Sequence, residues 1–567
     1  MIEAENELGN YQMKHHLLTG IVVLVFLAPP GMVLADCPSD GLTDIHQLKT
    51  DGRLEGQRVL ARGVVTANYL GEDRLNGFYL QSLTNSEAPA AGIFVYAPGL
   101  DADESIIESG REVVVAGRAG EFRGQRQISR VSQLMQCGHP GLPEPYTLNL
   151  PETERERWQA LEGRLVEIEQ PLTVIDNHDL ARYGSLGLAV DGRLFRPSNF
   201  TGEEAEQHEA DRNAARRIIL DDAHYRRDPQ PIPYLDENGT RRVGDRLPGL
   251  TGVLTHAFGN WRIHPLDPVE LAFEASNPRP SLPSRGAGPR IAAFNVENYF
   301  LTLGERGADT SSALDAQQSA LTAVAEGLDA DLLGLIELEN QPKVVDDLAI
   351  RLAGAGPAYT HFNIDQPVGT DAIRTALLWR EDTVTLKAGP FIDKRRVHHR
   401  PIIAGHFRFG EDGPGKLVAV VHFKAKTGCP EEGDIDRGQG CWNQRRTRQA
   451  EALAEFLAKK QEQTGTERVL IMGDINSYGG EDPVMALVEA GYRDMVAKRL
   501  EPEQRYSYVF HGESGYLDTA ITSPALAEDI EAVRFWHINA DEPRFLQFQQ
   551  PGPWRSSDHD PVVIDFR

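Results

Sequence analysis

A short apolar run near the end of the chain stops abruptly at polar residues. Residues 469–472 read Val-Leu-Ile-Met and continue into Gly473-Asp474-Ile475-Asn476. An uninterrupted apolar run of this length is typical of a strand that is buried on both faces. Asp474 and Asn476 lie two residues apart, so their side chains point to the same side. One of them can activate a water molecule that the other orients. The alternative is a strand end whose Asp and Asn bond only to the turn.

Polar residues also interrupt, end or closely precede other apolar runs in the second half of the chain. They are Asn295, Glu337, His422, Asp518, Asp558 and His559. Each one alone has an ordinary explanation, such as a strand-end hydrogen bond or a paired edge charge. A buried carboxylate destabilises a fold by several kcal/mol unless it is paired or bound to a metal. Together, these residues therefore predict one shared cation site.

The 567 residues are too many for one hydrophobic core and predict about three domains. Residues 36–142 contain short β-like runs between turns and resemble an oligonucleotide/oligosaccharide-binding (OB) barrel. Residues 143–274 repeat this pattern less clearly around a polar insertion at 201–216, which predicts a second OB-like barrel with a helical insertion. Residues 275–288 read as a linker. From 289 to 567, strands and helices alternate, which is typical of α/β layers.

The N-terminus has the pattern of a secretion signal. Lys14-His15-His16 precede an apolar run from Leu17 to Ala28, and small residues follow up to Ala35. This predicts a signal peptide over residues 1–35 with cleavage after Ala35, and translation starts at Met1 or at Met13. The alternative is a membrane anchor, for which the apolar run is short. We expect a secreted, extracellular or periplasmic protein without stable membrane association.

Four cysteines fit such an oxidising compartment. Three connectivities are possible, and sequence proximity favours Cys37 with Cys137 and Cys429 with Cys441. A zinc site is disfavoured, because the cysteines are neither paired as CxxC nor flanked by suitably spaced histidines.

The motifs around the polar residues follow one another in a fixed order. They are Ala293-Phe294-Asn295-Val296, Leu335-Ile336-Glu337, Val421-His422-Phe423, Met472-Gly473-Asp474-Ile475-Asn476, Leu517-Asp518 and Ser556-Ser557-Asp558-His559-Asp560-Pro561. With this set the chain resembles the endonuclease/exonuclease/phosphatase superfamily, which includes deoxyribonuclease I. Gly438-Gln439-Gly440-Cys441-Trp442-Asn443, among other stretches, resembles the secreted bacterial extracellular nucleases. The resemblance implies a four-layer α/β sandwich as the catalytic domain, preceded by two small all-β, OB-like barrels.

The resemblance also implies a role for each matching residue. Asn295, Glu337 and Asp558 would hold a Mg²⁺ or Mn²⁺ ion, which prefers oxygen ligands. The catalytic residues would be His422, Asp474, Asn476, Asp518 and His559. Asp474, aligned by Asn476, would orient or deprotonate the attacking water, and Asp518 or His559 could share this work. His559 would contact the phosphate and His422 would assist the leaving oxygen, but the motifs do not decide which histidine is the general acid.

Substrate binding requires local positive charge, because the formal net charge is -26. Arg374, Arg396 and Arg400 are the candidate phosphate contacts, and solvated surface charge is the alternative for the basic run around the last two. The Asp434-Ile435-Asp436 loop is a weak candidate for a structural Ca²⁺, since it lacks the full EF-hand spacing.

These features predict a secreted, monomeric, divalent-metal-dependent nuclease. It would hydrolyse phosphodiester bonds of DNA, with RNA as a further substrate, and would show low sequence specificity. Two alternatives remain open at this point. One is a phosphodiesterase or phosphatase that acts on small or lipid phosphates, and the other is an inactive nucleic-acid-binding protein.

Overall fold

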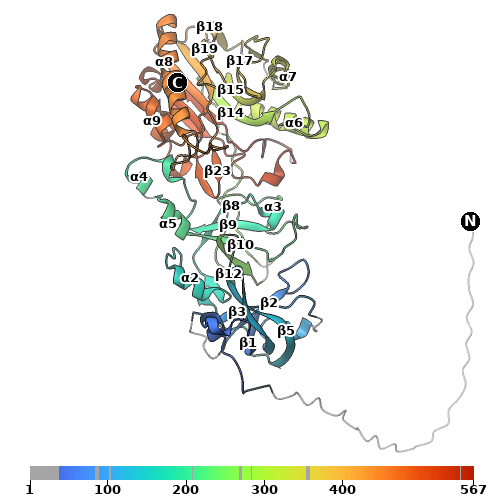
Figure 1. Cartoon of the computed structure of the whole chain (residues 1–567). Coiled ribbons are helices and arrows are strands. Elements are labelled where there is room, and N and C mark those ends of the chain that lie inside the picture. The colour runs from blue at the N-terminus through green and yellow to red at the C-terminus, as the bar shows by residue number, and fades with distance from the viewer. Residues whose placement is uncertain are drawn as a thin grey trace, which may run out of the picture.

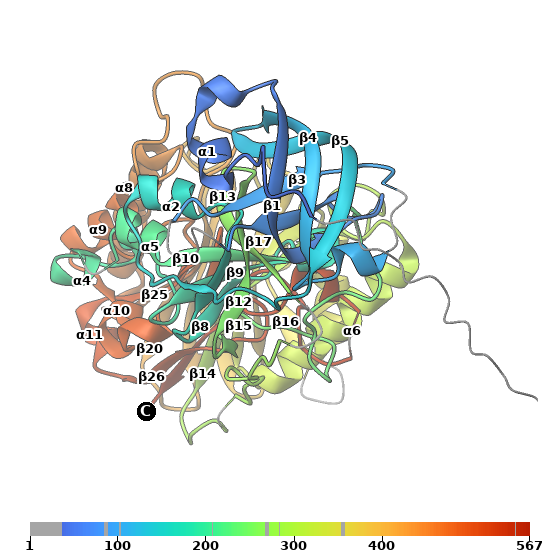
Figure 2. The same cartoon turned by 90° about the horizontal axis from the view of Figure 1, so that it is seen from below.

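A computed structural model describes residues 37–83, 89–100, 104–206, 208–266, 271–282, 284–352, 358–549 and 551–567. The predicted signal peptide over residues 1–35 lies outside the described residues. Three bodies follow one another in chain order, from a blue barrel through a green middle domain to a yellow-to-red C-terminal domain (Figure 1). Seen from below, the barrel lies in front of the other two bodies (Figure 2), so the three are arranged along one axis.

The first body is a closed five-stranded barrel. Its strand order is β1-β2-β3-β5-β4, in which β3 and β5 run parallel and β1 closes the barrel on β4. The elements are α1 (Ile45–Thr50), η1 (Gly52–Leu54), β1 (Arg58–Tyr69), β2 (Gly77–Gln81), β3 (Gly92–Tyr96), η2 (Glu104–Ile107), β4 (Glu112–Phe122) and β5 (Gln125–Gly138). The alternating inward residues of these strands form one core that includes Phe78, Leu80 and Val113.

The middle domain contains an eight-stranded sheet in the order β11-β8-β9-β10-β13-β12-β7-β6. Its two edge strands, β11 and β6, do not pair with each other among the described residues, so this sheet is not closed like the first barrel. The OB-like character of this domain stays a prediction. The polar insertion contains two short helices, as predicted. The elements are β6 (Tyr146–Thr147), α2 (Arg155–Leu161), β7 (Leu165–Ile168), β8 (Leu172–Asp176), α3 (Leu180–Tyr183), β9 (Ser185–Val190), η3 (Pro197–Asn199), α4 (Glu203–Glu206), α5 (Ala210–Ala215), β10 (Arg217–Asp221), β11 (Arg246–Leu247), β12 (Leu250–Ala257) and β13 (Asn260–Pro265).

Two six-stranded mixed sheets form the centre of the C-terminal domain. The first has the order β16-β17-β15-β14-β27-β26 and contains β14 (Arg290–Tyr299), β15 (Leu332–Glu339), β16 (Tyr359–His361), β17 (Ile373–Arg380), β26 (Ile530–Phe535) and β27 (Val562–Phe566). The second has the order β18-β19-β20-β21-β25-β22 and contains β18 (Val384–Asp393), β19 (Ile402–Phe409), β20 (Gly415–His422), β21 (Val469–Asp474), β22 (Arg493–Asp494) and β25 (Asp518–Thr522).

Helices cover the outer faces of both sheets. α6 (Ser311–Leu328) and α7 (Pro342–Leu352) share a core with the first sheet, whereas α8 (Asn443–Thr464) and α9 (Asp482–Glu489) share one with the second. A third core lies between the sheets and contains Leu470 and Met472, while Ile471 packs under the helices of the second sheet. The apolar run is thus buried on both faces, and the domain is a four-layer α/β sandwich.

The remaining elements of the C-terminal domain are short and lie between its strands near the end of the chain. They are α10 (Met495–Arg499), η4 (Pro502–Gln504), β23 (Tyr508–Phe510), β24 (Glu513–Gly515), α11 (Pro524–Ala527) and η5 (Arg544–Leu546). No helix in the described part of the chain combines the length and the apolar character that a bilayer crossing requires.

Two disulfide bonds join Cys37 to Cys137 and Cys429 to Cys441, which are the pairs that the sequence favours. The first ties the start of the described chain to the end of β5, and the second closes the loop before α8. Disulfides of this kind are typical of proteins that fold in an oxidising compartment.

The middle domain is bound to the sandwich through buried ion pairs. Arg242 pairs with Glu542, and Arg193 Nη1 lies 2.8 Å from Asp541 Oδ1. Arg279, within the predicted linker, donates from Nε to Glu542 Oε1 at 2.8 Å. The linker segment therefore packs into this interface.

We expect Asp221 of β10 to stabilise the protein only above acidic pH. Burial raises the pKa of this carboxyl, but His264 and Arg262 outweigh burial and lower it from 3.8 to about 2. Because the folded-state pKa is depressed, the stabilisation is present above about pH 4 and is lost as the pH falls toward 2. Asp221→Asn should lower the free energy of unfolding by about 2 kcal/mol at pH 7.

Thermal denaturation between pH 7 and pH 2 measures this effect. The difference in melting temperature between wild type and Asp221→Asn should shrink below pH 4. Asp191→Asn is the matched control, because it removes an exposed carboxylate. A difference that stays constant down to pH 2 would contradict the role of Asp221.

Candidate active site

Five strands deliver polar side chains to one edge of the sandwich. Asn295 lies in β14 and Glu337 in the neighbouring parallel strand β15. His422 and Asp474 end the parallel strands β20 and β21, and Asp518 begins β25, which runs antiparallel to β21. Since parallel strands end at the same edge and an antiparallel neighbour begins there, the two sheets bring all five residues together.

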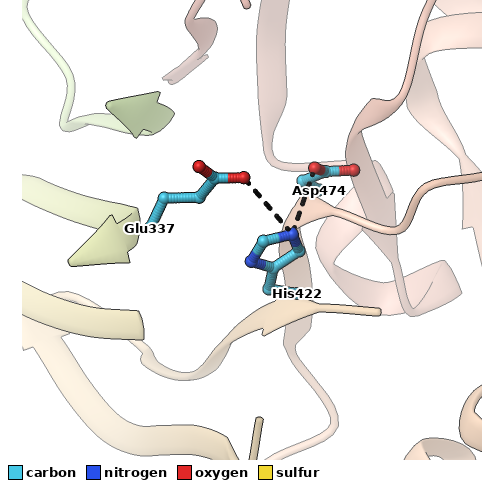
Figure 3. A group of neighbouring side chains, drawn as sticks. All are labelled: Glu337, His422 and Asp474. Carbon is cyan, nitrogen blue, oxygen red and sulfur yellow. Dashed lines mark ion pairs between the residues drawn. The ribbon is translucent and has the colours of Figure 1, made fainter. Parts of the chain in front are cut away.

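Asn295 connects the two sheets at this edge. Its Nδ2 donates to Glu337 Oε1 at 3.2 Å and to Asp474 Oδ2 at 3.2 Å. His422 Nε2 lies 3.4 Å from Asp474 Oδ2 and 3.8 Å from Glu337 Oε1 (Figure 3). In Figure 3, Glu337 and Asp474 approach the His422 ring from opposite sides.

The carboxylates at this edge lie close together and are shielded from solvent. Burial raises the pKa of Asp474 to about 7, and the charges of Asp518 and Glu337 add to this effect against that of His559. Burial and the charge of Asp558 also raise the pKa of Glu337. A cation among these groups would lower both pKa values, because it favours the ionised forms.

The donor set suits a divalent metal ion. One ligand atom each from Glu337, His422 and Asp474 lies within 4.8 Å of the others. The predicted metal ligands were Asn295, Glu337 and Asp558, so Glu337 is common to both sets. Asn295 bonds directly to Glu337, and Asp558 is near enough for its charge to raise the pKa of that residue. Carboxylate and amide oxygens are the ligands that Mg²⁺ and Mn²⁺ prefer.

His559 is held by an acidic partner. Its Nδ1 donates to Asp518 Oδ2 at 2.8 Å, and Ser507 Oγ donates to the same oxygen at 2.7 Å. Burial lowers the pKa of His559, but the charges of Asp518 and Asp558 outweigh burial and raise it well above the usual value. The imidazole is therefore charged at neutral pH.

His422 has the opposite character. Burial lowers its pKa well below the usual value, and the charges of Arg400 and His559 lower it further. The two histidines at this edge therefore differ in charge although they are the same residue type.

Asn476 contacts Asp474 twice. Its backbone N–H donates to Asp474 Oδ1 at 2.7 Å, and its side-chain Nδ2 donates to Oδ2 at 3.1 Å. Asn476 has a φ of 49°, in the left-handed region that asparagine tolerates better than most residues. This turn fixes the orientation of the Asp474 carboxylate.

The three candidate arginines lie in different surroundings. Arg400 Nη1 donates to Phe423 O at 2.8 Å, and its charge reaches both His422 and Glu337. Arg374 is buried in β17, and burial lowers its pKa to about 10. Arg396 is exposed, and no hydrogen bond or ion pair between described residues joins it to the site.

The candidate calcium loop is held by hydrogen bonds between its carboxylates and the backbone. Asp434 accepts hydrogen bonds from the backbone of Gln444 and Arg445 at the start of α8. Asp436 Oδ1 accepts from the backbone of Gly438 and Gly440. These bonds fix the loop against the start of α8, and calcium binding there stays a prediction.

Sequence reasoning missed three residues at the site. Ser507 holds Asp518, and Ser557 Oγ donates to Asn295 O at 2.7 Å. The Tyr508 ring packs on His559, with 4.7 Å between ring centroids. Ser557 lies inside the motif around Asp558 and His559, which was the available signal. Ser507 and Tyr508 lie in a loop and a short strand with no distinguishing pattern.

Comparisons with known proteins agree with this geometry. Residues 292–559 match the Endonuclease/Exonuclease/phosphatase family. The C-terminal domain belongs to this family. The superfamily predicted from the motifs is thereby confirmed, and members of the family are metal-dependent hydrolases. Residues 151–273 match a domain of unknown function, DUF8508. No curated protein matches the chain.

Solved structures of endonuclease/exonuclease/phosphatase proteins are similar to this domain. Humanized TDP2 of D. rerio is 15% identical, with 50% of this chain and 100% of that chain covered and a TM-score of 0.35. An endonuclease/exonuclease/phosphatase family protein of Bacteroides thetaiotaomicron is 18% identical, with 49% and 97% covered and a TM-score of 0.34. A mannosyl-6-phosphatase of the same species is 17% identical, with 49% and 99% covered and a TM-score of 0.33.

Removal of the Asp518 charge should lower the pKa of His559. In Asp518→Asn the hydrogen-bond geometry remains, but the nearest negative charge is lost. NMR titration of ring-labelled histidines in EDTA-treated protein measures this change. Asp393→Asn, beside His398, is the control and should leave His559 unaffected. An unchanged His559 pKa in Asp518→Asn would contradict the assignment.

Proposed function

We propose that this endonuclease/exonuclease/phosphatase protein is a secreted, divalent-metal-dependent nuclease. The observation that carries the proposal is the meeting of Asn295, Glu337, Asp474 and the Asp518–His559 pair at one edge of the sandwich. This arrangement combines a cation site, a base and a charged hydrogen-bond donor, which are the groups that phosphodiester hydrolysis requires.

Asn295, Glu337 and Asp558 would hold a Mg²⁺ or Mn²⁺ ion. When bound, the ion supplies Lewis-acid polarisation of the phosphoryl group and neutralises developing charge. His422 and Asp474 border the same point and complete its polar surroundings.

Asp474 would orient the attacking water and take its proton. The two hydrogen bonds from Asn476 fix the carboxylate for this purpose. The water oxygen forms the new bond to phosphorus while the ester P–O bond breaks on the opposite side. One carboxylate oxygen must therefore face the substrate when the phosphate is in place.

His559 would donate a hydrogen bond to a non-bridging phosphate oxygen. Its Nδ1 is used by Asp518, so Nε2 is the nitrogen left for substrate. Because it is charged, His559 is also the stronger proton donor for the leaving oxygen. His422, being neutral, would assist that oxygen through a hydrogen bond only.

A nucleic acid is the substrate that we favour. The closed barrel has the strand order β1-β2-β3-β5-β4 with a parallel β3–β5 pair, and we assign it to the OB type, whose members bind oligonucleotides and oligosaccharides. Arg400 supplies local positive charge near the site. We further propose a monomer, secreted by means of the N-terminal signal, and the two disulfides support the oxidising compartment.

Cleavage assays test this function directly. Plasmid DNA, RNA and bis(p-nitrophenyl) phosphate are incubated with the full chain in Mg²⁺ or in EDTA. We expect plasmid cleavage in Mg²⁺ alone. Asp474→Asn and His559→Ala should lower kcat by about 10²–10⁴-fold, which is typical for loss of a general acid or base.

Glu489→Gln, an exposed carboxylate on α9, is the control and should retain full activity. Intact nucleic acid with cleavage of the small diester would favour a phosphodiesterase acting on small or lipid phosphates. No turnover of any substrate would favour a binding protein. Activity that survives EDTA would overturn the metal-dependent mechanism.

A further inference from the structure

The middle domain forms one wall of a cavity at the active site. The cavity has a volume of about 220 Å³ and is lined by His178 from the segment between β8 and α3. Tyr508, Glu297 and Asp558 line it from the C-terminal domain. Since Asp558 belongs to the proposed metal site, the cavity opens beside the position of the scissile phosphate.

The wall from the middle domain is held firmly in place. The buried side chain of Asn177 donates from Nδ2 to Arg241 O and to Asp541 O, both at 2.9 Å. One of these acceptors belongs to each domain, so Asn177 ties the segment to both. The neighbouring His178 is exposed at the cavity.

The rings of Tyr508 and Phe510 form a row that begins at His559 and ends at the protein surface. The Tyr508 and His559 ring centroids lie 4.7 Å apart, and the Phe510 ring lies nearly parallel to the Tyr508 ring, with 6.4 Å between centroids and 17° between planes. Tyr508 and Phe510 are two residues apart on β23, so they share one face of the strand. Phe510 is 50% exposed, although large apolar side chains are normally buried.

Two arginines line the cavity beside the acidic residues Asp176, Glu297, Glu542 and Asp558. Arg544 and Arg555 line it, and either one can contact a backbone phosphate. Glu542 lines it too, but its charge is compensated by Arg242 and Arg279. Flat rings beside positive charge are the combination with which proteins bind single-stranded nucleic acid.

We propose that Tyr508, Phe510 and His178 form a subsite for an unpaired nucleobase next to the scissile phosphate, which makes single-stranded nucleic acid the preferred substrate. The proposal rests on the nuclease function above. An aromatic ring can stack on a base only when that base has left its neighbour in a duplex, so paired DNA would have to unstack before it enters.

Steady-state kinetics in Mg²⁺ test the subsite. The full chain is assayed with a single-stranded DNA oligonucleotide, the matching duplex and bis(p-nitrophenyl) phosphate, which has no base. We expect a higher kcat/KM for the single strand than for the duplex. In His178→Ala and Phe510→Ala, the ratio of kcat/KM for the oligonucleotide to that for the small diester should fall by about 5–100-fold, chiefly through KM.

Two further variants separate stacking from a structural effect. Phe510→Trp keeps a flat ring and should restore the ratio. Tyr183→Ala removes an exposed ring of the middle domain that packs beside Arg182 and Arg227 rather than beside Tyr508, and it should leave the ratio unchanged. Ratios equal to wild type in His178→Ala and Phe510→Ala, or equal use of duplex and single strand, would overturn the subsite while the nuclease function stands. Cleavage of the small diester alone would overturn both.

Discussion

The amide of Asn295 bonds to one carboxylate in each of the two sheets, and the active site depends on this link. Glu337 and Asp474 are acids of low solvent exposure, and burial is the main cause of the raised pKa of each. The neutral amide of Asn295 holds the two carboxylates in position but does not neutralise their negative charge. That charge would favour a cation at the site, and the charges of Asp518 and Asp558 keep His559 protonated. The fold therefore concentrates negative charge at the position where a metal ion with its bound phosphate would reduce it.

The buried ion pairs of Arg193 and Arg242 give the middle domain a fixed orientation on the sandwich. Such pairs contribute little net stability, because desolvation of the charges offsets much of their attraction. Their geometric demands are strict, however, and a shifted domain would separate Asp541 and Glu542 from Arg193 and Arg242. This requirement explains how a segment of a separate sheet domain can be placed against the active site with enough accuracy to bind substrate.

The sequence predicted the parts of the structure that depend on local pattern. Asp474 was recognisable because it ends an apolar run, and the four-layer sandwich followed from the family resemblance of the motifs. The open sheet of the middle domain was not predicted, because β6 and β11 are only two residues long each and have no periodicity to detect. Ser507 and His178 reach the site through tertiary packing of irregular segments. Nothing in their immediate sequence distinguishes them from other loop residues.

The two histidines show most clearly why roles require a structure. His422 ends an apolar run and His559 closely precedes one, and the motifs left open which one is the general acid. His559 faces Asp518, whereas the Nδ1 of His422 has no hydrogen-bond partner among the described residues and lies in reach of the Arg400 charge. The first environment favours the charged imidazole and the second the neutral one. The chemical difference between the two residues arises from partners more than 20 positions away in the chain, so only the folded arrangement of the strand ends can assign it.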